Sequence, residues 1–258
     1  MKSSTSQEIQ LKWNADAFVP RVSIDLVIFG FHDGQLKVLL LRWKNGEDWM
    51  LPSGFILHEE DMENAAHRSL QQRTGLQSVF LQQFHTFGEA DRFKHFSKQE
   101  TMRRLGFPGD TDEPLFRRHV SVGYYALVEF AEVVPTPDEL TDECRWWDVE
   151  EVPPLLFDHN DMIRLALKVL RRQLSYQPIG YNLLPEKFTM PELQRLYETI
   201  LGQPLDRRNF QKQMLGYGIL ERLEERKTGG AHKAPYLYRF DKEKYEQALD
   251  DGMSTHGL

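Results

Sequence analysis

The sequence has little of several features that define whole classes of protein. Its 258 residues include a single cysteine, Cys144, which excludes an intramolecular disulfide and a thiolate-rich metal site and is typical of a reducing compartment. The longest apolar runs, at 24–31 and 38–41, are far shorter than the roughly 20 residues of a membrane-spanning helix. The first residues lack the apolar segment of a signal peptide. We therefore expect a cytoplasmic protein without membrane association.

An excess of basic charge is also missing. The chain holds 32 Lys and Arg against 39 Asp and Glu, a net charge of −7, and such an acidic average argues against a nucleic-acid-binding protein. The distribution is uneven, however, because residues 183–240 hold 10 Lys and Arg against 7 Asp and Glu. The length predicts about two domains of ordinary size, and the second of them remains a candidate for binding nucleic acid.

Most of the chain up to residue 175 is organised as alternating strands and helices. Apolar and β-branched runs predict strands at 21–31, 35–43, 77–87, 119–134 and 143–149, and the first two form a hairpin around His-Asp-Gly. Apolar residues at helical spacing predict helices at 60–74, capped by Gly75, and at 158–175. Residues 91–119 form a long insertion, for which we expect a short helix near 98–105.

The last third of the chain has a different texture. Thr189 and Glu192 form a capping box at the start of one helix, and Asp206 caps a second. Two short strands follow, and this order is typical of a winged helix-turn-helix. We therefore expect a lead-in at 1–19, a first domain at 20–180, a winged helix-turn-helix at 181–245 and a tail at 246–258.

A set of fixed spacings lies in the first domain. The pattern G-x5-E-x7-R-E-U-x-E-E-x-G-U, in which U is a bulky aliphatic residue, is matched by Gly54, Glu60, Arg68, Leu70, Gly75 and Leu76. This stretch resembles the Nudix box. The resemblance implies a Nudix fold, a mixed sheet between helices, for about residues 20–155.

The same stretch lacks the carboxylates on which Nudix chemistry depends. Their three positions, on one face of a helix, are occupied by Ser69, Gln72 and Arg73. Carboxylates there would gather Mg²⁺, whereas the permanent charge of Arg73 would repel it. We therefore expect no metal site, no cofactor and no enzymatic activity.

Substitute metal ligands remain an alternative at this place. The nearby acidic residues are Glu59, Glu60, Asp61 and Glu63. We favour the interpretation that they stabilise the positive end of the helix, with Glu60 pairing Arg68.

The second helix of the winged domain carries donors that suit DNA. Phe210, Met214 and Leu215 are expected to face the core, which leaves on the outer face Arg207, Arg208, Asn209, Gln211 and Lys212. Arg, Asn and Gln are the side chains that recognise G and A in the major groove. The tip of the wing adds Lys227, His232 and Lys233 for phosphate or minor-groove contact. The alternative is a solvated helix face or a protein-docking module.

The two parts together resemble the Nudix-related transcriptional regulators of bacteria, of the NrtR and arabinose-regulator type. The resemblance covers about residues 20–240 and implies an α/β (α+β) chain in which a Nudix mixed-sheet sandwich precedes a small winged helix-turn-helix domain. It further implies a homodimeric repressor of operator DNA, whose effector is ADP-ribose-like or a pentose of sugar metabolism such as L-arabinose. The insertion at 91–119 departs from the family pattern and leaves the effector open.

The effector site is predicted from polar and aromatic residues that the Nudix fold directs towards its cleft. These candidates are Arg42, Trp49, Phe55 and Tyr124. Aromatic rings with one arginine suit a sugar and a nucleotide equally. The rival hypothesis is a Mg²⁺-dependent hydrolase of a nucleoside-diphosphate-linked substrate with rearranged metal ligands. A third is a protein-docking scaffold that binds neither DNA nor substrate.

Overall fold

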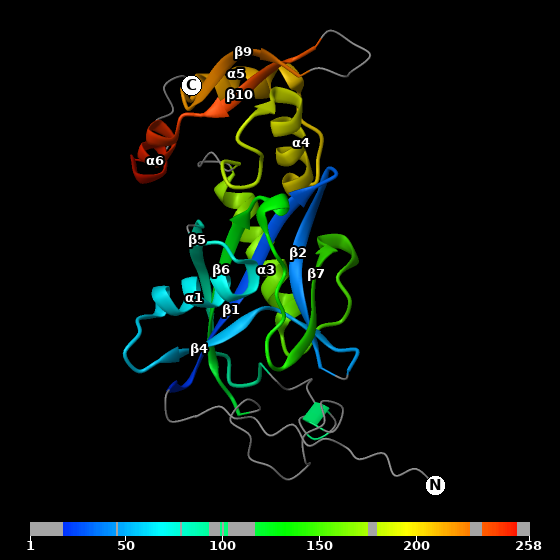
Figure 1. The fold of residues 1–258 in the computed structure, drawn as a ribbon, viewed down its shortest axis with the longest axis vertical. Helices are drawn as coiled ribbons and strands as arrows, with labels where there is room; N and C mark the ends of the chain where they lie inside the picture. The colour runs from blue at the N-terminus through cyan, green and yellow to red at the C-terminus, as the bar shows by residue number, and fades with distance from the viewer. Residues whose placement is uncertain are drawn as a thin grey trace. The chain divides into compact units, whose positions relative to one another are not determined.

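The computed structural model describes residues 18–44, 46–77, 79–92, 99, 101–102, 117–174, 180–227 and 234–251 (Figure 1). The chain forms two compact units, and each is described by itself. The first unit takes residues up to 28 together with 38–126 and 133–163. The second takes 29–37, 127–132 and the chain from 164 onwards.

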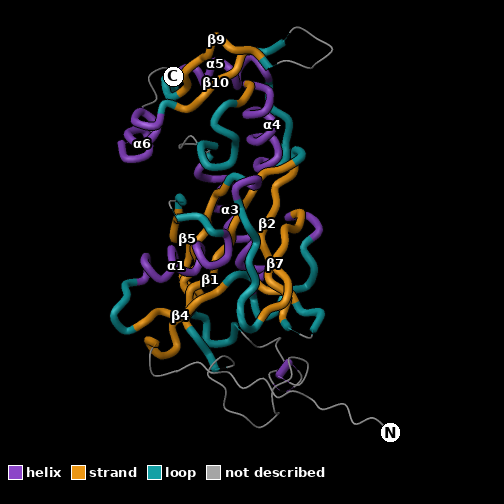
Figure 2. The backbone as a smooth tube through the Cα atoms, in the orientation of Figure 1, coloured by secondary structure: helices purple, strands orange, loops and turns teal. Residues whose placement is uncertain are grey.

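A seven-stranded sheet is the framework of the first unit (Figure 2). Its main path runs β3-β2-β1-β6-β5, while β4 pairs with β1 and β7 pairs with β2. The strands are β1 (Phe18–His32), β2 (Gln35–Trp43), β3 (Trp49–Met50), β4 (Ser53–Leu57), β5 (Leu81–Phe87), β6 (Val120–Val128) and β7 (Thr141–Asp148). Residues 23–30 of β1, most of β2 and nearly all of β6 are buried, as expected of central strands covered on both faces.

Two helices accompany this sheet. Helix α1 (Met62–Thr74) packs against β4, and α3 (His159–Gln173) buries Met162, Ala166 and Leu170 along one side. Asp61 caps α1 and Gly75 ends it with a left-handed φ of 77°, so the helix begins two residues later than predicted. Among the described residues, no helix is long and apolar enough to cross a membrane.

Two strands of the structure are shorter than predicted. The strand expected at 119–134 ends at Val128, and a short 3-10 helix, η3 (Phe130–Glu132), follows it. The strand expected at 77–87 begins only at Leu81. A second 3-10 helix, η4 (Val149–Glu151), follows β7.

The insertion predicted at 91–119 lies largely outside the described residues. Three residues of its middle part are described, and one of them, Met102, is 1% exposed. Met102 belongs to an apolar cluster with Trp43, Met50 and Leu156. The insertion therefore contributes at least one side chain to the core of the first unit.

The second unit has the predicted order of helix, turn, helix and hairpin. Its elements are β8 (Phe188–Thr189), α4 (Met190–Leu201), α5 (Arg207–Gly216), β9 (Leu220–Arg226), β10 (Tyr236–Phe240) and α6 (Lys242–Asp251). The sheet order is β8-β10-β9. The capping box of Thr189 and Glu192 is present, and Asp206 caps α5. Leu215 was expected in the core, but it is 44% exposed, because it lies off the face that carries Phe210 and Met214.

The tip of the β1–β2 hairpin belongs to the second unit as well. Asp33 and Gly34 both have left-handed backbone angles, with φ of 51° and 76°. The Gly34 carbonyl accepts a hydrogen bond of 3.0 Å from the Thr199 hydroxyl of α4. The ring of His32 stacks on Phe130 with centroids 4.1 Å apart. Sequence reasoning assigned this hairpin wholly to the first domain, whereas its tip packs with α4.

Candidate functional site

A cavity of about 340 Å³ opens in the first unit. This volume lies within the range of small-molecule sites in proteins. Its wall combines aromatic rings, among them Phe55 and His119, with polar groups, which include Asp25, Ser53, Arg92 and His159. The β1–β4 register places Asp25 opposite Ser53, and α3 brings His159 to the same place. The cavity therefore gathers side chains from distant parts of the sequence.

Asp25 is the central polar group of the cavity wall, and only 4% of it is exposed. The Ser53 hydroxyl donates a hydrogen bond of 2.6 Å to Asp25 Oδ1, and His159 Nε2 lies 3.5 Å from the same oxygen. Burial opposes ionisation, but His159 and the hydroxyls of Ser53 and Ser121 outweigh it and hold the pKa of Asp25 at about 2. Asp25 is therefore a carboxylate at neutral pH.

The orientation of the His159 ring follows from its two neighbours, the Leu51 amide and Asp25. The Leu51 amide donates a hydrogen bond of 2.9 Å to His159 Nδ1, so this nitrogen is an acceptor. The ring proton therefore sits on Nε2, which faces Asp25. The cavity wall thus carries an acceptor, Asp25, beside a donor, His159 Nε2.

Aromatic rings form another part of the wall. Phe55 lies between Phe18 and His119, with ring centroids 5.9 Å and 5.6 Å away. Burial lowers the pKa of His119, which keeps its ring neutral at pH 7. The rings of Phe18, Phe55 and His119 can pack against a flat ligand ring, while Asp25 can accept hydrogen bonds from ligand hydroxyls.

Arg92 lies in the cavity wall, and its guanidinium donates hydrogen bonds to other groups of the protein. Its guanidinium makes a two-point contact with Asp158, at 2.9 Å and 2.8 Å. It also donates to the carbonyls of Phe87 and His119. The side chain is only 3% exposed, so Arg92 ties the strand ends around the cavity to the start of α3.

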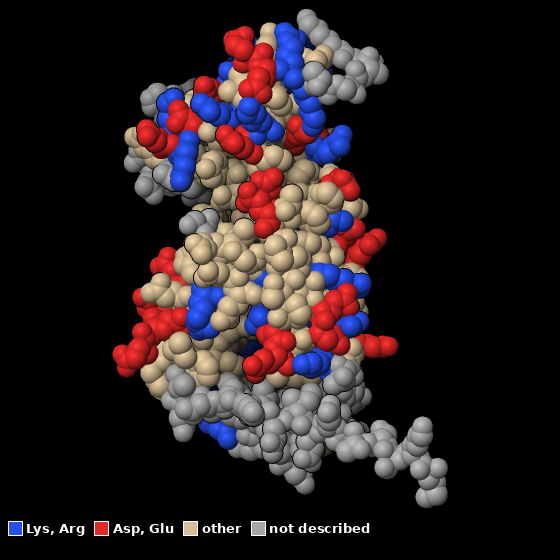
Figure 3. Space-filling model, in the orientation of Figure 1, with Lys and Arg blue, Asp and Glu red and all other residues tan. Residues whose placement is uncertain are grey.

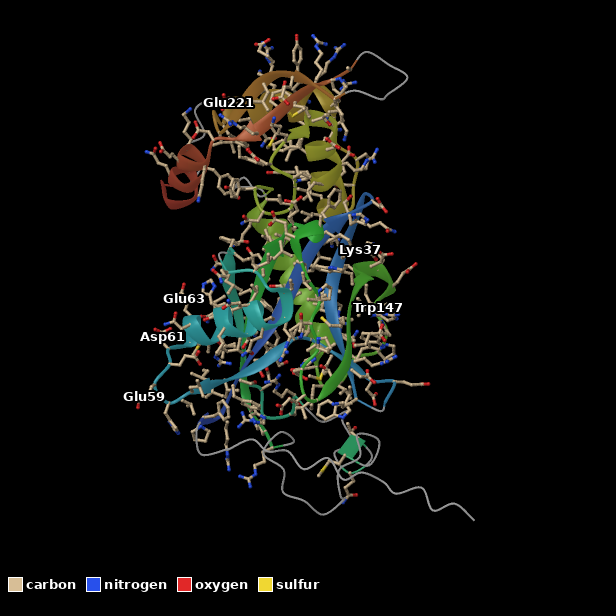
Figure 4. The ribbon with its side chains drawn as sticks, in the orientation of Figure 1. Lys37, Glu59, Asp61, Glu63, Trp147 and Glu221 are labelled. Carbon is tan, nitrogen blue, oxygen red and sulfur yellow. The ribbon has the colours of Figure 1, made fainter. Side chains whose placement is uncertain are left out.

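Of the four predicted effector residues, Phe55 lines the cavity, whereas Arg42, Trp49 and Tyr124 do not belong to its lining. Arg42 pairs with two acidic side chains of β7, Asp142 and Glu143, each at 2.9 Å. Trp49 packs edge-on against Trp147, which Figure 4 labels, and Arg145 lies over both rings.

Tyr124 is buried on β6. Its pKa is raised by burial and, to a smaller extent, by Glu63 and Asp61. The Tyr124 hydroxyl therefore lies within electrostatic range of the acidic residues at the start of α1.

Sequence reasoning missed Asp25, His119 and His159. Asp25 did leave a signal, because it is a lone acidic residue inside the apolar run of β1. His119 and His159 left none, since each precedes or begins an element whose partners come from elsewhere in the chain.

The residues of the Nudix-box frame hold the turn around α1 together. Glu60 and Arg68 form the predicted pair, with two contacts of 2.8 Å and 2.7 Å. Arg68 lowers the pKa of Glu60 and also donates to the Phe55 carbonyl. Gly54 is needed because a Cβ there would lie 2.2 Å from Ser69 Oγ. Gly75 caps the helix.

The three positions that lack carboxylates are occupied differently. Ser69 is buried beneath Gly54, and Gln72 is exposed. Arg73 is buried and contacts Asp138 at 2.7 Å. No group of three or more His, Cys, Asp and Glu side chains able to hold a metal ion occurs in the part of the chain that the structure describes.

The acidic residues considered as substitute ligands stand at the start of α1. Glu59, Asp61 and Glu63 are exposed, and Figure 4 labels all three. Asp61 caps the helix by accepting a hydrogen bond of 2.9 Å from the Asn64 amide. Together with the Glu60–Arg68 pair, this cap supports the helix-end interpretation for Asp61 and Glu60.

The predicted DNA-binding residues of α5 lie on its outer side. Phe210 and Met214 are buried, Gln211 is half-buried, and exposed positions are taken by Arg207, Arg208, Asn209 and Lys212. Within the described residues, the cations of this helix form no ion pair with an acidic side chain.

Of the predicted cations of the wing, Lys227 lies among the described residues. Lys227 Nζ pairs with Glu192 Oε1. His232 and Lys233 lie outside the described residues.

The fold and the two sites define a Nudix-domain protein with a C-terminal winged helix. Family models agree with this division, since the NUDIX domain matches residues 19–166 and the NrtR DNA-binding winged helix domain matches residues 180–240. The chain belongs to the NrtR-type family, in which these two domains are joined.

Individual relatives resemble the chain over most of its length. A curated protein of Acinetobacter baylyi, the "ADPR responsive transcriptional repressor NtrR", is 30% identical over 88% of this chain and 84% of its own length. The crystal structure of Shewanella oneidensis NrtR complexed with a 27mer DNA is 26% identical, with a TM-score of 0.69 over 87% of this chain and 95% of its own. An RNA pyrophosphohydrolase of Saccharophagus degradans is 41% identical, but only over 24% of this chain and 35% of its own length.

Proposed function

We propose that this protein is a transcriptional repressor that binds operator DNA through its winged helix and responds to an ADP-ribose-like effector bound in the cavity of its Nudix unit. The observation that carries the proposal is the similarity to the ADPR-responsive repressor of Acinetobacter baylyi across both parts of the chain. We infer that residues 20–180 bind the effector and residues 181–245 bind DNA. The protein acts in the cytoplasm as a homodimer, which would match a two-fold operator.

Recognition of DNA is assigned to α5. Its exposed side chains Arg207, Arg208 and Asn209 follow the N-cap and can reach base edges in the major groove, with Lys212 one turn further on. Because no acidic side chain among the described residues pairs with these cations, contact with DNA breaks no ion pair. The DNA complex of the Shewanella relative supports this assignment.

ADP-ribose is favoured over a free pentose as the effector. The rings of Phe18, Phe55 and His119 offer an apolar surface for a base, and Asp25 can accept hydrogen bonds from ribose hydroxyls. A carboxylate repels phosphate, so the diphosphate would lie away from Asp25. The similarity to the ADPR-responsive repressor of Acinetobacter baylyi supports the same effector.

We infer that the Nudix unit binds without hydrolysing. Ser69, Gln72 and Arg73 stand where hydrolases of this fold carry carboxylates, and Arg73 is engaged with Asp138. Without those ligands, the three positions of the helix at which hydrolases of this fold carry carboxylates offer none to Mg²⁺. The alternative, a hydrolase with rearranged ligands, is favoured only by the short similarity to an RNA pyrophosphohydrolase.

Fluorescence anisotropy with a labelled duplex from the region upstream of its own gene tests the proposal. We expect sequence-preferring binding that ADP-ribose weakens at least tenfold and L-arabinose leaves unchanged. Replacing Arg207 or Arg208 by Gln should cost about 1–3 kcal/mol of binding free energy if the side chain reads a base. Absence of sequence preference would contradict the proposal. Steady conversion of ADP-ribose that a chelator abolishes would favour the hydrolase.

A further inference from the structure

Two arginines of the wing share one aromatic ring. The guanidinium of Arg226 lies 3.9 Å from the ring centroid of Tyr236, and that of Arg222 lies 4.7 Å from it. Arg222 and Arg226 belong to β9, and the β9–β10 register places Tyr236 opposite Arg226. Both arginines are exposed, while the ring between the strands is half-buried. Tyr236 thus holds both arginine side chains against its ring.

Two other described cations around the wing are engaged with carboxylates. Lys187 contacts Glu225 at 2.8 Å, and Arg239 contacts Glu221 at 2.7 Å. Figure 3 shows the corresponding mixture of basic and acidic side chains over this unit, without a broad basic area in that view. Against this background, Arg222 and Arg226 form no ion pair with any residue that the structure describes. Among the residues that the structure describes, the Arg226 side chain donates a hydrogen bond only to the Ala234 carbonyl, at 3.1 Å.

Lys227 forms an ion pair with a carboxylate of another element, α4. Its Nζ pairs with Glu192 Oε1, while Glu192 Oε2 accepts a hydrogen bond of 2.8 Å from the Thr189 amide. Glu192 is thus the carboxylate of the α4 capping box and the partner of the wing at once. Moving Lys227 onto a phosphate would leave this carboxylate without its cation.

We propose that Arg222 and Arg226, positioned by Tyr236, are the phosphate-binding cations of the wing, and that Lys227 instead fastens the wing to the start of α4. The assignment rests on the proposed DNA-binding function. Two guanidiniums on one ring repel each other, and a phosphodiester between them relieves that repulsion. A guanidinium also matches phosphate geometry through two parallel hydrogen bonds, which an ammonium does not. Tyr236 is a positioning residue and does not itself touch DNA.

The salt dependence of binding tests this assignment in the full-length protein. Each phosphate contact contributes about 0.9 to the slope of log K against log salt concentration. Because the proposed homodimer carries each arginine twice, we expect Arg222→Gln and Arg226→Gln each to reduce the slope by about twice that amount, equally on operator and unrelated duplexes. Arg239→Gln is the matched control, an exposed arginine of the neighbouring strand that already has a carboxylate partner, and its slope should equal that of the wild type.

Further variants separate positioning from folding. Tyr236→Phe keeps the ring and should bind DNA as the wild type does, whereas Tyr236→Leu should weaken binding several-fold at fixed salt. Glu224 lies between the two arginines on β9 and is exposed, so Glu224→Gln should raise affinity by removing a nearby negative charge. Lys227→Gln should lower the thermal midpoint and keep the slope. Circular dichroism melting curves for every variant identify a loss of folding.

The possible outcomes distinguish this assignment from the proposed function. A wild-type protein that binds no duplex at any salt concentration overturns the proposed function and the assignment with it. Wild-type binding with unchanged slopes for Arg222→Gln and Arg226→Gln overturns the assignment alone. So does a reduced slope for Lys227→Gln in a fully folded protein. A loss confined to one DNA sequence would make the arginines base-reading residues and would likewise overturn the assignment.

Discussion

A single carboxylate, Asp25, links the cavity of the first unit to its stability. The pKa of Asp25 is lowered from 3.8 to about 2, so its contribution is complete above about pH 4 and disappears as the pH falls towards 2. We expect Asp25→Asn to lower the free energy of unfolding by about 2 kcal/mol at pH 7, with a smaller difference at pH 3. Urea denaturation at both pH values measures this. Asp33→Asn, at an exposed turn that suits Asn, is the control, and an equal loss at both pH values would contradict the prediction.

The lone cysteine offers a second test at the scale of one residue. Burial raises the pKa of Cys144 from 9.0 to about 12. Because the thiolate is the reactive form, the folded thiol should react with a disulfide reagent at pH 8 about a thousandfold more slowly than the unfolded chain. Absorbance measurements with and without urea check this. Equal rates in the two conditions would show that Cys144 is accessible in the folded protein.

How far single residues could be foreseen depends on whether their partners are close in sequence. The Glu60–Arg68 pair and the Gly75 cap were predicted because both act within one helical segment. The pair of Asp25 and His159 could not be, since only the β1–β4 register and the docking of α3 bring them together. Of the predicted effector residues, Arg42, Trp49 and Tyr124 lie outside the lining of this cavity.

At the scale of elements, two glycines should respond oppositely to the same substitution. Gly34 has φ of +76°, and a Cβ there would meet Arg195 Cδ at 3.2 Å, so Gly34→Ala should lower the free energy of unfolding by about 1–2 kcal/mol. Gly216 ends α5, and a Cβ added there would meet no other atom within 4 Å. Gly216→Ala should therefore raise the free energy of unfolding by about 0.5 kcal/mol. Urea denaturation compares the two variants. Destabilisation by both would mean that Gly216 has a packing role.

The elements of the winged helix were predictable where capping residues punctuate the sequence. Thr189 with Glu192, and Asp206, mark the starts of α4 and α5 through side chains that bond the first free amides. Helix α6 was missed, because it is mostly polar and depends on Tyr245, which packs against Tyr181. Strand β8 has only two residues and shows no period. Tertiary contacts decide these two elements.

At the scale of the whole molecule, the two proposed binding events must influence each other equally. If ADP-ribose weakens operator binding by a given factor, saturation with operator must weaken ADP-ribose binding by the same factor, because the coupling free energy is a property of the protein and both ligands. Calorimetric titration of ADP-ribose into the free protein and into its DNA complex, compared with DNA titrations at saturating ADP-ribose, measures both factors. L-arabinose is the control ligand.

This reciprocity also separates a sensor from an enzyme. For a repressor that binds ADP-ribose without consuming it, the two factors are equal to each other both with Mg²⁺ and with chelator present. A hydrolase with rearranged ligands would convert ADP-ribose during the titration, so that with Mg²⁺ the two factors would disagree and the heat would continue after each injection. Because Ser69, Gln72 and Arg73 offer no carboxylate to the metal, we expect the equality to hold in both conditions.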